Sequence, residues 1–185
     1  MKIARTKGSY LAPLLDLLTA IDPDNVRLTF LCHSMGNRIF QHMLMGSNLS
    51  TTRRKRINHY ISVGADLESN IFEKGEPLEW LHTVVDDITI YIHDNDRSLT
   101  MSKLVNKSLR VGLNGVDLQQ LPENFKIVDV SNITDHINFV SSISNHRYFY
   151  MSPAVMKDLG RMVRNEDINI DKRILDHPRK YQLLR

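Results

Sequence analysis

The sequence predicts an α/β fold built on a mainly parallel sheet. Short β-rich runs alternate with segments of helical length, which indicates crossover connections between parallel strands and helices on both faces. Hydrophobic residues make up 42% of the 185 residues and charged residues 24%, which is typical of a globular domain and excludes a disordered chain. No internal repeat and no linker rich in Gly, Ser or Pro divides the chain. We therefore expect one domain over residues 1–165 and a polar, peripheral tail over residues 166–185.

The first half of the chain contains a helix, a strand, a tight turn and a second helix. Apolar residues at helical spacing predict the first helix over residues 11–21, and Asp22-Pro23-Asp24 ends it. The β-rich run Val26–Cys32 predicts a strand, and apolar residues at helical spacing predict a helix over residues 35–46. A second strand is expected over Ile57–Ala65.

The second half continues the alternation of helices and strands. In chain order we expect a helix over residues 71–85, which contains Trp80, a strand over 88–93, a helix over 99–106, a strand over 125–130 and a helix over 153–163. Pro153 suits the first position of the last helix, where a missing N–H costs nothing.

Composition and charge exclude several classes of function. The net charge of +3 and the pI of about 9.0 are a mild bias. The basic cluster Arg53–Arg56 is interpreted as a solvated helix end or loop and not as a nucleic-acid contact, because no nucleic-acid motif accompanies it. No apolar run approaches the roughly 18 residues of a membrane span, and residues 1–10 lack the apolar stretch of a secretory signal. With a single cysteine, the chain as written is expected in the cytoplasm.

The junction between the first strand and its helix carries a candidate nucleophile. Residues 32–36 (CHSMG) have the form of the nucleophile elbow G-x-S-x-G, with Cys32 in place of the first glycine. The sharp turn needs small residues two positions to each side of the serine, a need that Cys32 and Gly36 meet. Such a turn exposes the Ser34 hydroxyl and aims the Met35 N–H at a developing oxyanion. The alternative is that Ser34 only caps the helix, and the local sequence favours neither interpretation.

A serine nucleophile needs a base, and the base needs an acid that orients it. Asp94 and Asp96 follow the third predicted strand and Asp66 follows the second, so all three lie at the carboxyl edge of a parallel sheet. An Asp after a strand is also a common turn residue. His136 and His146 follow the fourth strand, downstream of both the serine and the acids, although a histidine in a loop is often an ordinary surface residue.

Several spaced motifs between about residues 10 and 160 resemble a bacterial family of uncharacterised, esterase- or lipase-like proteins with the α/β-hydrolase fold. They are His33–Arg38 (HSMGNR), Gly64–Asp66 (GAD), Asp96–Leu99 (DRSL), Ser102, Arg110–Gly112 (RVG), Asp129–Ser131 (DVS), His146–Phe149 (HRYF), Pro153–Val155 (PAV) and Asp158–Leu159. The resemblance implies Ser34 as the nucleophile, Asp96 as the acid and His146 as the base, with no metal or organic cofactor. Asp66 is the alternative acid.

Two other histidines are given no catalytic role by the resemblance. His33 is interpreted only as the neighbour of Ser34, because adjacent side chains on the turn are expected to point apart. His136 has no counterpart in the family pattern and serves as a control residue.

By the same resemblance the chain starts at the helix before the elbow strand and forms a partial α/β-hydrolase fold with its amino-terminal strands missing. We therefore expect Val26–Cys32 to form a sheet edge that pairs with another copy or with the missing segment. Only one oxyanion donor, the Met35 N–H, is supplied locally, and the loss of one donor costs about 10²–10³ in rate. Two functions stay open: a serine esterase acting on a small-molecule ester, and a non-catalytic remnant or interaction module that associates through this edge.

Overall fold

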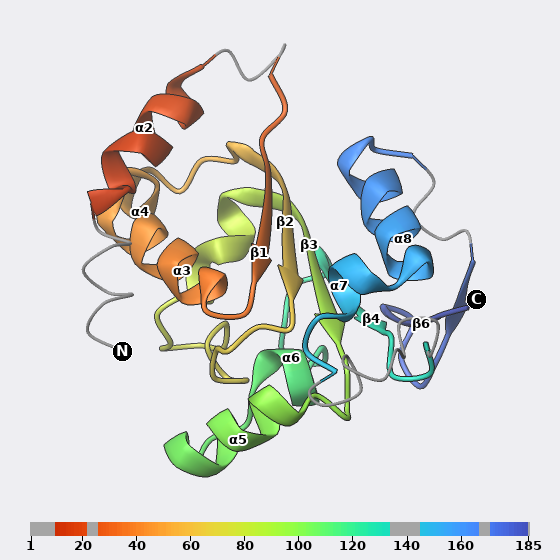
Figure 1. Cartoon of the computed structure of the whole chain (residues 1–185). Helices are drawn as coiled ribbons and strands as arrows, with labels where there is room; N and C mark the ends of the chain where they lie inside the picture. Colours follow the sequence, from red (N-terminus) through yellow and green to blue (C-terminus); the bar gives the residue numbers. More distant parts are fainter. Residues whose placement is uncertain (1–9, 22–25, 134–144, 167–170, 185) are drawn as a thin grey trace.

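The computed structural model describes residues 10–21, 26–133, 145–166 and 171–184 (Figure 1). Within these ranges the chain forms a six-stranded sheet in the order β1-β2-β3-β4-β6-β5. The strands are β1 (Thr29–His33), β2 (Ile57–Val63), β3 (Val85–Ile92), β4 (Phe125–Asp129), β5 (Lys172–Ile174) and β6 (Lys180–Leu183). Every neighbouring pair is parallel except β5 and β6, which are antiparallel. The predicted α/β fold with a mainly parallel sheet is confirmed.

Apolar cores lie on both faces of this sheet. Adjacent residues of a strand point to opposite faces, so Tyr60 and Ile61 of β2 belong to different cores, and so do Ile90 and Tyr91 of β3. All four side chains are fully buried. The inner strands are apolar on both sides because helices cover both faces, as in other parallel sheets.

The helices divide between the two faces. The first core receives apolar side chains from α2 (Ala12–Ala20), α3 (Gly36–Gly46) and the 3₁₀ helix η1 (Glu79–Thr83), and the second from α7 (Tyr148–Met151) and α8 (Pro153–Val163). Figure 1 shows α2 and α3 on one side of the strands and α8 on the other. The remaining helices are α4 (Leu49–Thr52), α5 (Arg97–Asn106) and α6 (Val111–Asn114). Pro153 occupies the first turn of α8 as predicted.

The predicted helix over residues 71–85 is wrong. The segment consists of turns followed by η1, and its apolar residues, including Phe72, Leu78 and Leu81, still pack into the first core. Gly75 has a φ of +86° and Pro77 follows it. A left-handed glycine and a proline both interrupt a helix, so the apolar spacing here reflects burial alone.

The tail after Asn165 joins the sheet, which differs from the expected peripheral position. β6 pairs in parallel with β4, with Val128 opposite Tyr181, and β5 forms a hairpin with β6. The Arg179 guanidinium fastens the hairpin further, because it donates to the carbonyl oxygens of Leu118, Leu121 and Pro122. The strands are short and polar, so their residues carry little apolar pattern.

β1 lies at the edge of the sheet in the described part of the chain and pairs only with β2. This matches the edge expected at Val26–Cys32. Leu31 on this strand is 45% exposed. None of the helices in the described ranges has the length and apolarity to cross a membrane.

Candidate active site

The turn between β1 and α3 holds Ser34 in a left-handed backbone conformation. Its φ is +52°, which costs a non-glycine residue on the order of 1 kcal/mol. The Ser34 N–H donates to the carbonyl oxygen of Val63 over 3.0 Å, so the turn is tied to the end of β2. α3 begins at Gly36 with Met35 as its N-cap, and no side-chain hydrogen bond caps it. The alternative interpretation of Ser34 as a helix cap is therefore wrong.

Asn37 fixes this turn from the inside and is itself fully buried. Its Nδ2 donates to the carbonyl oxygens of Cys32 and Ser34, each over 3.1 Å. Its Oδ1 accepts from the hydroxyls of Tyr60 at 2.7 Å and Ser62 at 3.0 Å. One amide therefore joins both sides of the serine to β2. No pattern in the sequence predicts this role of Asn37, because only the folded chain brings these partners together.

Asp96 and His146 form a hydrogen-bonded pair. The Asp96 side chain is fully buried; its Oδ1 accepts from the Leu99 N–H at 3.0 Å and caps α5, and its Oδ2 accepts from His146 Nδ1 at 2.6 Å. Because a carboxylate only accepts, the His146 proton lies on Nδ1, and in the neutral ring Nε2 carries the lone pair. This is the arrangement in which an acid orients a general base.

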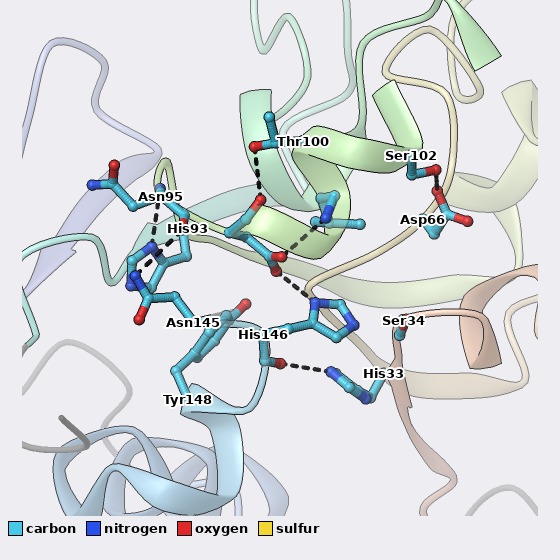
Figure 2. A network of polar contacts seen from close by, with 12 residues as sticks. His33, Ser34, Asp66, His93, Asn95, Thr100, Ser102, Asn145, His146 and Tyr148 are labelled. Atoms are coloured by element: carbon cyan, nitrogen blue, oxygen red, sulfur yellow. Dashed lines mark hydrogen bonds and ion pairs between the residues drawn. The ribbon is translucent and has the colours of Figure 1, made fainter. Parts of the chain in front are cut away.

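The Ser34 turn and the His146–Asp96 pair both lie against the end of β2. Gly64 has a φ of +50°, and a Cβ there would lie 3.5 Å from His146 Cε1 and 3.7 Å from Asp96 Oδ2, so its backbone packs directly against the pair. Val63, which binds the Ser34 N–H, immediately precedes it. Figure 2 shows the Ser34 side chain beyond the edge of the His146 ring that faces away from the hydrogen-bonded carboxylate.

Gly112, and not the elbow residue Gly36, is the glycine that packs tightly against the end of β2. A Cβ on Gly112 would lie 2.3 Å from the Ala65 N and 2.4 Å from the Gly64 carbonyl carbon, so only glycine fits beneath the end of β2. A Cβ on Gly36 would meet nothing within 4 Å. The expectation that Gly36 must be small to prevent a collision is therefore wrong for the described part of the chain.

The Met35 N–H is the candidate oxyanion donor. It directly follows Ser34 at the start of α3, and no hydrogen bond within the described residues occupies it. The Met35 residue is 40% exposed.

Asp66, the alternative acid, lies in a different cluster. Its Oδ1 accepts from the Ser102 hydroxyl at 2.5 Å, and its carboxylate forms ion pairs with Arg38 at 3.4 Å and Arg110 at 3.5 Å. Arg110 is fully buried. Burial lowers the Arg110 pKa, and the Asp66 carboxylate opposes that shift. The structure thus brings Asp96, and not Asp66, to His146.

His33 makes contacts that the sequence analysis missed. Its Nε2 donates to the backbone carbonyl oxygen of His146 over 3.0 Å. Its ring lies 4.6 Å from the His146 ring and stacks at 4.2 Å on Phe149, measured between centroids. The interpretation of His33 as a mere neighbour of Ser34 is wrong. No sequence signal identifies this contact, because it joins residues on separate elements.

The other candidates lie outside this arrangement. The Asp94 side chain is 65% exposed and accepts from the Asn95 amide, as a turn residue does. Burial raises the pKa of the Cys32 thiol to about 12, so Cys32 carries no thiolate at neutral pH. His136 lies outside the described residues.

The basic cluster Arg53–Arg56 is partly engaged within the molecule. The Arg53 guanidinium stacks on Trp80 at 4.3 Å from the ring centroid, and Lys55 pairs with Asp86 at 3.2 Å. The cluster precedes β2 and therefore lies at the opposite end of that strand from Gly64. As for metals, no group of three or more His, Cys, Asp and Glu side chains in the described ranges is arranged to hold an ion.

A parallel sheet with a strained serine turn after one strand, and an acid and a histidine after later strands, defines the class of α/β hydrolases. Residues 5–164 match a family described as alpha/beta hydrolases of unknown function (DUF900), and the chain belongs to this family. Neither the curated proteins nor the solved structures gave a match.

Proposed function

We propose that this chain is a serine hydrolase that cleaves carboxylic esters through an acyl-enzyme intermediate. Ser34 is the nucleophile, His146 the general base and acid, and Asp96 the residue that orients His146. The observation that carries the proposal is the 2.6 Å bond from His146 Nδ1 to the buried Asp96 carboxylate, beside a serine in a strained conformation. Backbone strain of this kind is concentrated at functional sites.

The reaction follows from these positions. Ser34 Oγ bonds to the ester carbonyl carbon while its proton passes to His146 Nε2, and the carbonyl oxygen becomes an oxyanion stabilised by the Met35 N–H. His146 then returns the proton to the leaving alcohol as the C–O bond breaks. A water molecule, deprotonated by the same ring, attacks the acyl-enzyme and releases the acid and Ser34. The Asp96 carboxylate stabilises the imidazolium in both steps.

Labelling with a fluorophosphonate probe tests the proposal, because such a probe reacts with an activated serine. The native chain is expected to be labelled at Ser34, and Ser34→Ala and His146→Ala to lose the label. His136→Ala is the control histidine and should be labelled as the native chain is. Equal labelling of all four proteins contradicts the assignment.

The two candidate acids are separated in the same assay. Asp96→Asn is expected to slow labelling by about 10⁴, because it disturbs the tautomer of the base. Asp66→Asn leaves the hydrogen bond between Asp96 and His146 intact. It should be labelled at a rate similar to that of the native chain once equal amounts of folded protein are compared. A larger loss in Asp66→Asn than in Asp96→Asn would overturn the choice of acid.

The edge strand favours a second candidate function, an interaction module without catalysis. β1 pairs on one side only in the described part of the chain, and exposed edges of this kind recruit further strands. This function predicts self-association in sizing chromatography together with an absence of Ser34 labelling. A monomer that turns over p-nitrophenyl acetate through Ser34 would contradict it.

A further inference from the structure

The helix α5 extends from the candidate active site with little cover. It begins at Arg97 with Asp96 as its N-cap, and Leu99 is its only buried residue. Figure 1 shows α5 at the end of the molecule toward which β1, β2 and β3 point, well beyond those strands. An isolated helix shorter than about 12 residues is marginal in water, so the stability of this ten-residue helix depends on contacts with neighbours.

The outer face of α5 is apolar. Met101, Leu104 and Val105 are 59%, 65% and 76% exposed, and Leu109, just past the helix, is 50% exposed. The spacing of i, i+3 and i+4 places the first three on one side of the helix. We call these four residues the α5 patch. Contiguous exposed apolar side chains of this kind mark an interaction surface.

Charge along α5 and the turn that follows it is of one sign. Residues 97–116 include Arg97, Lys103, Lys107 and Arg110 but no Asp or Glu, whereas the exposed Glu68 lies opposite Arg110 and the exposed Asp94 precedes the helix. Arg97 and Lys107 are exposed, Lys103 is half-buried, and Arg110 is buried beside Asp66. The Asp66 carboxylate beneath the helix is already engaged by Ser102, Arg38 and Arg110. A partner of this surface therefore meets apolar side chains together with the basic side chains of Arg97, Lys103 and Lys107 on the same helix and its caps.

This combination selects among the possible partners. A second copy of the chain would bring the same basic side chains against the first, and like charges would oppose that contact. An apolar face with basic flanks instead suits an anionic lipid surface, where apolar side chains enter the acyl boundary and lysines lie at the phosphates. We propose that the α5 patch docks the chain on anionic membranes, with the rim that carries Ser34 and His146 on the same side.

Vesicle binding tests this proposal without using the chemistry of the site. We would measure cosedimentation with vesicles of phosphatidylcholine alone and of phosphatidylcholine mixed equally with phosphatidylglycerol. Binding to the mixed vesicles only, weakening as salt is raised, is expected. Ser34→Ala should bind as the native chain does, so the result is independent of the proposed hydrolysis. Failure to bind the mixed vesicles overturns the proposal.

Variants then locate the surface. Leu104→Ser with Val105→Ser is expected to weaken binding at least about tenfold, and Lys103→Gln and Lys107→Gln about fivefold each. Leu14→Ser with Leu17→Ser is the matched control, because these α2 side chains are 49% and 66% exposed on a different helix. Thermal unfolding followed by circular dichroism confirms that each variant is folded.

Three outcomes overturn the proposal. One is equal loss of binding in the α2 and α5 variants, which indicates nonspecific adsorption. Another is a dimer in sizing chromatography that only the α5 variant abolishes, which assigns the patch to a second copy. The third is binding of an acidic protein for which vesicles do not compete, which assigns the α5 patch to a protein partner.

Discussion

The Nε2 atom of His33 donates a hydrogen bond of 3.0 Å to the backbone carbonyl oxygen of His146. Because a carbonyl oxygen only accepts, the Nε2 of His33 must carry a proton. The residue before the proposed nucleophile thus fixes the backbone of the proposed base. The same segment is held from the other side by the Asp96 carboxylate, which accepts from the His146 ring.

Loss of the His33 hydrogen bond should slow the reaction of Ser34. In His33→Leu the His146 backbone loses its donor and Phe149 its stacking partner, and a small displacement of the base costs about 10–100-fold in rate. His33→Gln keeps an N–H donor of similar reach and should recover most of the rate. The fluorophosphonate labelling rate measures this, and equal rates in both variants would show that the hydrogen bond does not position the base.

Stability should fall at acidic pH partly through His33. Burial is the main cause that lowers the pKa of His33 below its ordinary value of 6.5; the nearby His146 charge lowers it further, while the bond to the His146 backbone and the Asp96 charge raise it. The unfolded chain therefore binds this proton more readily than the folded chain. The free energy of unfolding should decrease as pH falls below 6.5 and be insensitive to this group above it. Urea unfolding of native and His33→Gln protein from neutral to acidic pH checks this, and identical slopes would refute it.

Asn37→Ala should destabilise the fold more than an ordinary helix substitution. It leaves the buried Tyr60 and Ser62 hydroxyls without their shared acceptor and frees the carbonyl oxygens on each side of the turn. Unpaired buried polar groups cost about 1–3 kcal/mol each, so we expect a loss of about 3 kcal/mol in urea unfolding. Gln41→Ala on the same helix is the control and should change stability by less than about 0.5 kcal/mol. Comparable losses would show that Asn37 does not hold the turn.

Two glycine-to-alanine changes should have opposite effects. At Gly112 the added Cβ meets the backbone of Gly64 and Ala65, which cannot move without shifting the end of β2, so a loss of about 3 kcal/mol or more is expected. At Gly36 the Cβ meets open space in the first turn of α3, and the better helix propensity of alanine should leave stability equal or raise it by up to about 1 kcal/mol. Thermal unfolding measures the stability of both variants. A larger loss in Gly36→Ala than in Gly112→Ala would show that the elbow glycine, Gly36, makes the tight packing contact.

The sequence predicted the elements whose pattern is local. β2, β3 and β4 are read directly from β-rich runs, and α8 from Pro153 and its apolar face, because propensity and burial agree there. The segment with Gly75 and Pro77 was misread, because its apolar residues are buried in the first core without forming a helix. The spacing of apolar residues indicates which side chains are buried. Only turn residues such as Gly and Pro distinguish a helix from a buried series of turns.

The residues of the candidate site also differ in whether the sequence could identify them. Strand ends and chain order located the serine and several candidate acids and histidines, and the family resemblance selected Ser34, Asp96 and His146 among them. The roles of His33, Asn37 and Gly112 could not, because each depends on a contact between separate elements. For the same reason the sequence could not show that Asp66 forms ion pairs with Arg38 and Arg110.

The carboxyl-terminal hairpin is attached to the fold by a buried charge pair. Lys172 of β5 donates to Asp158 of α8, and Asp158 also accepts from the Tyr91 hydroxyl of β3 over 2.5 Å. The two charged side chains are only 2% and 1% exposed. Lys172→Met would leave a buried carboxylate without its cation, and breaking one half of such a pair costs about 3–5 kcal/mol.

Two comparisons identify the cause of that loss. Lys157→Met removes a lysine that is 62% exposed and pairs with Asp171, so it should cost less than about 1 kcal/mol. Adding Asp158→Asn to Lys172→Met removes the unpaired charge but keeps an acceptor for Tyr91, so most of the lost stability should return. Urea unfolding measures all three proteins. If the double variant is no more stable than Lys172→Met, the buried charge is not the cause, and the hairpin is held instead by its strand pairing and by Arg179.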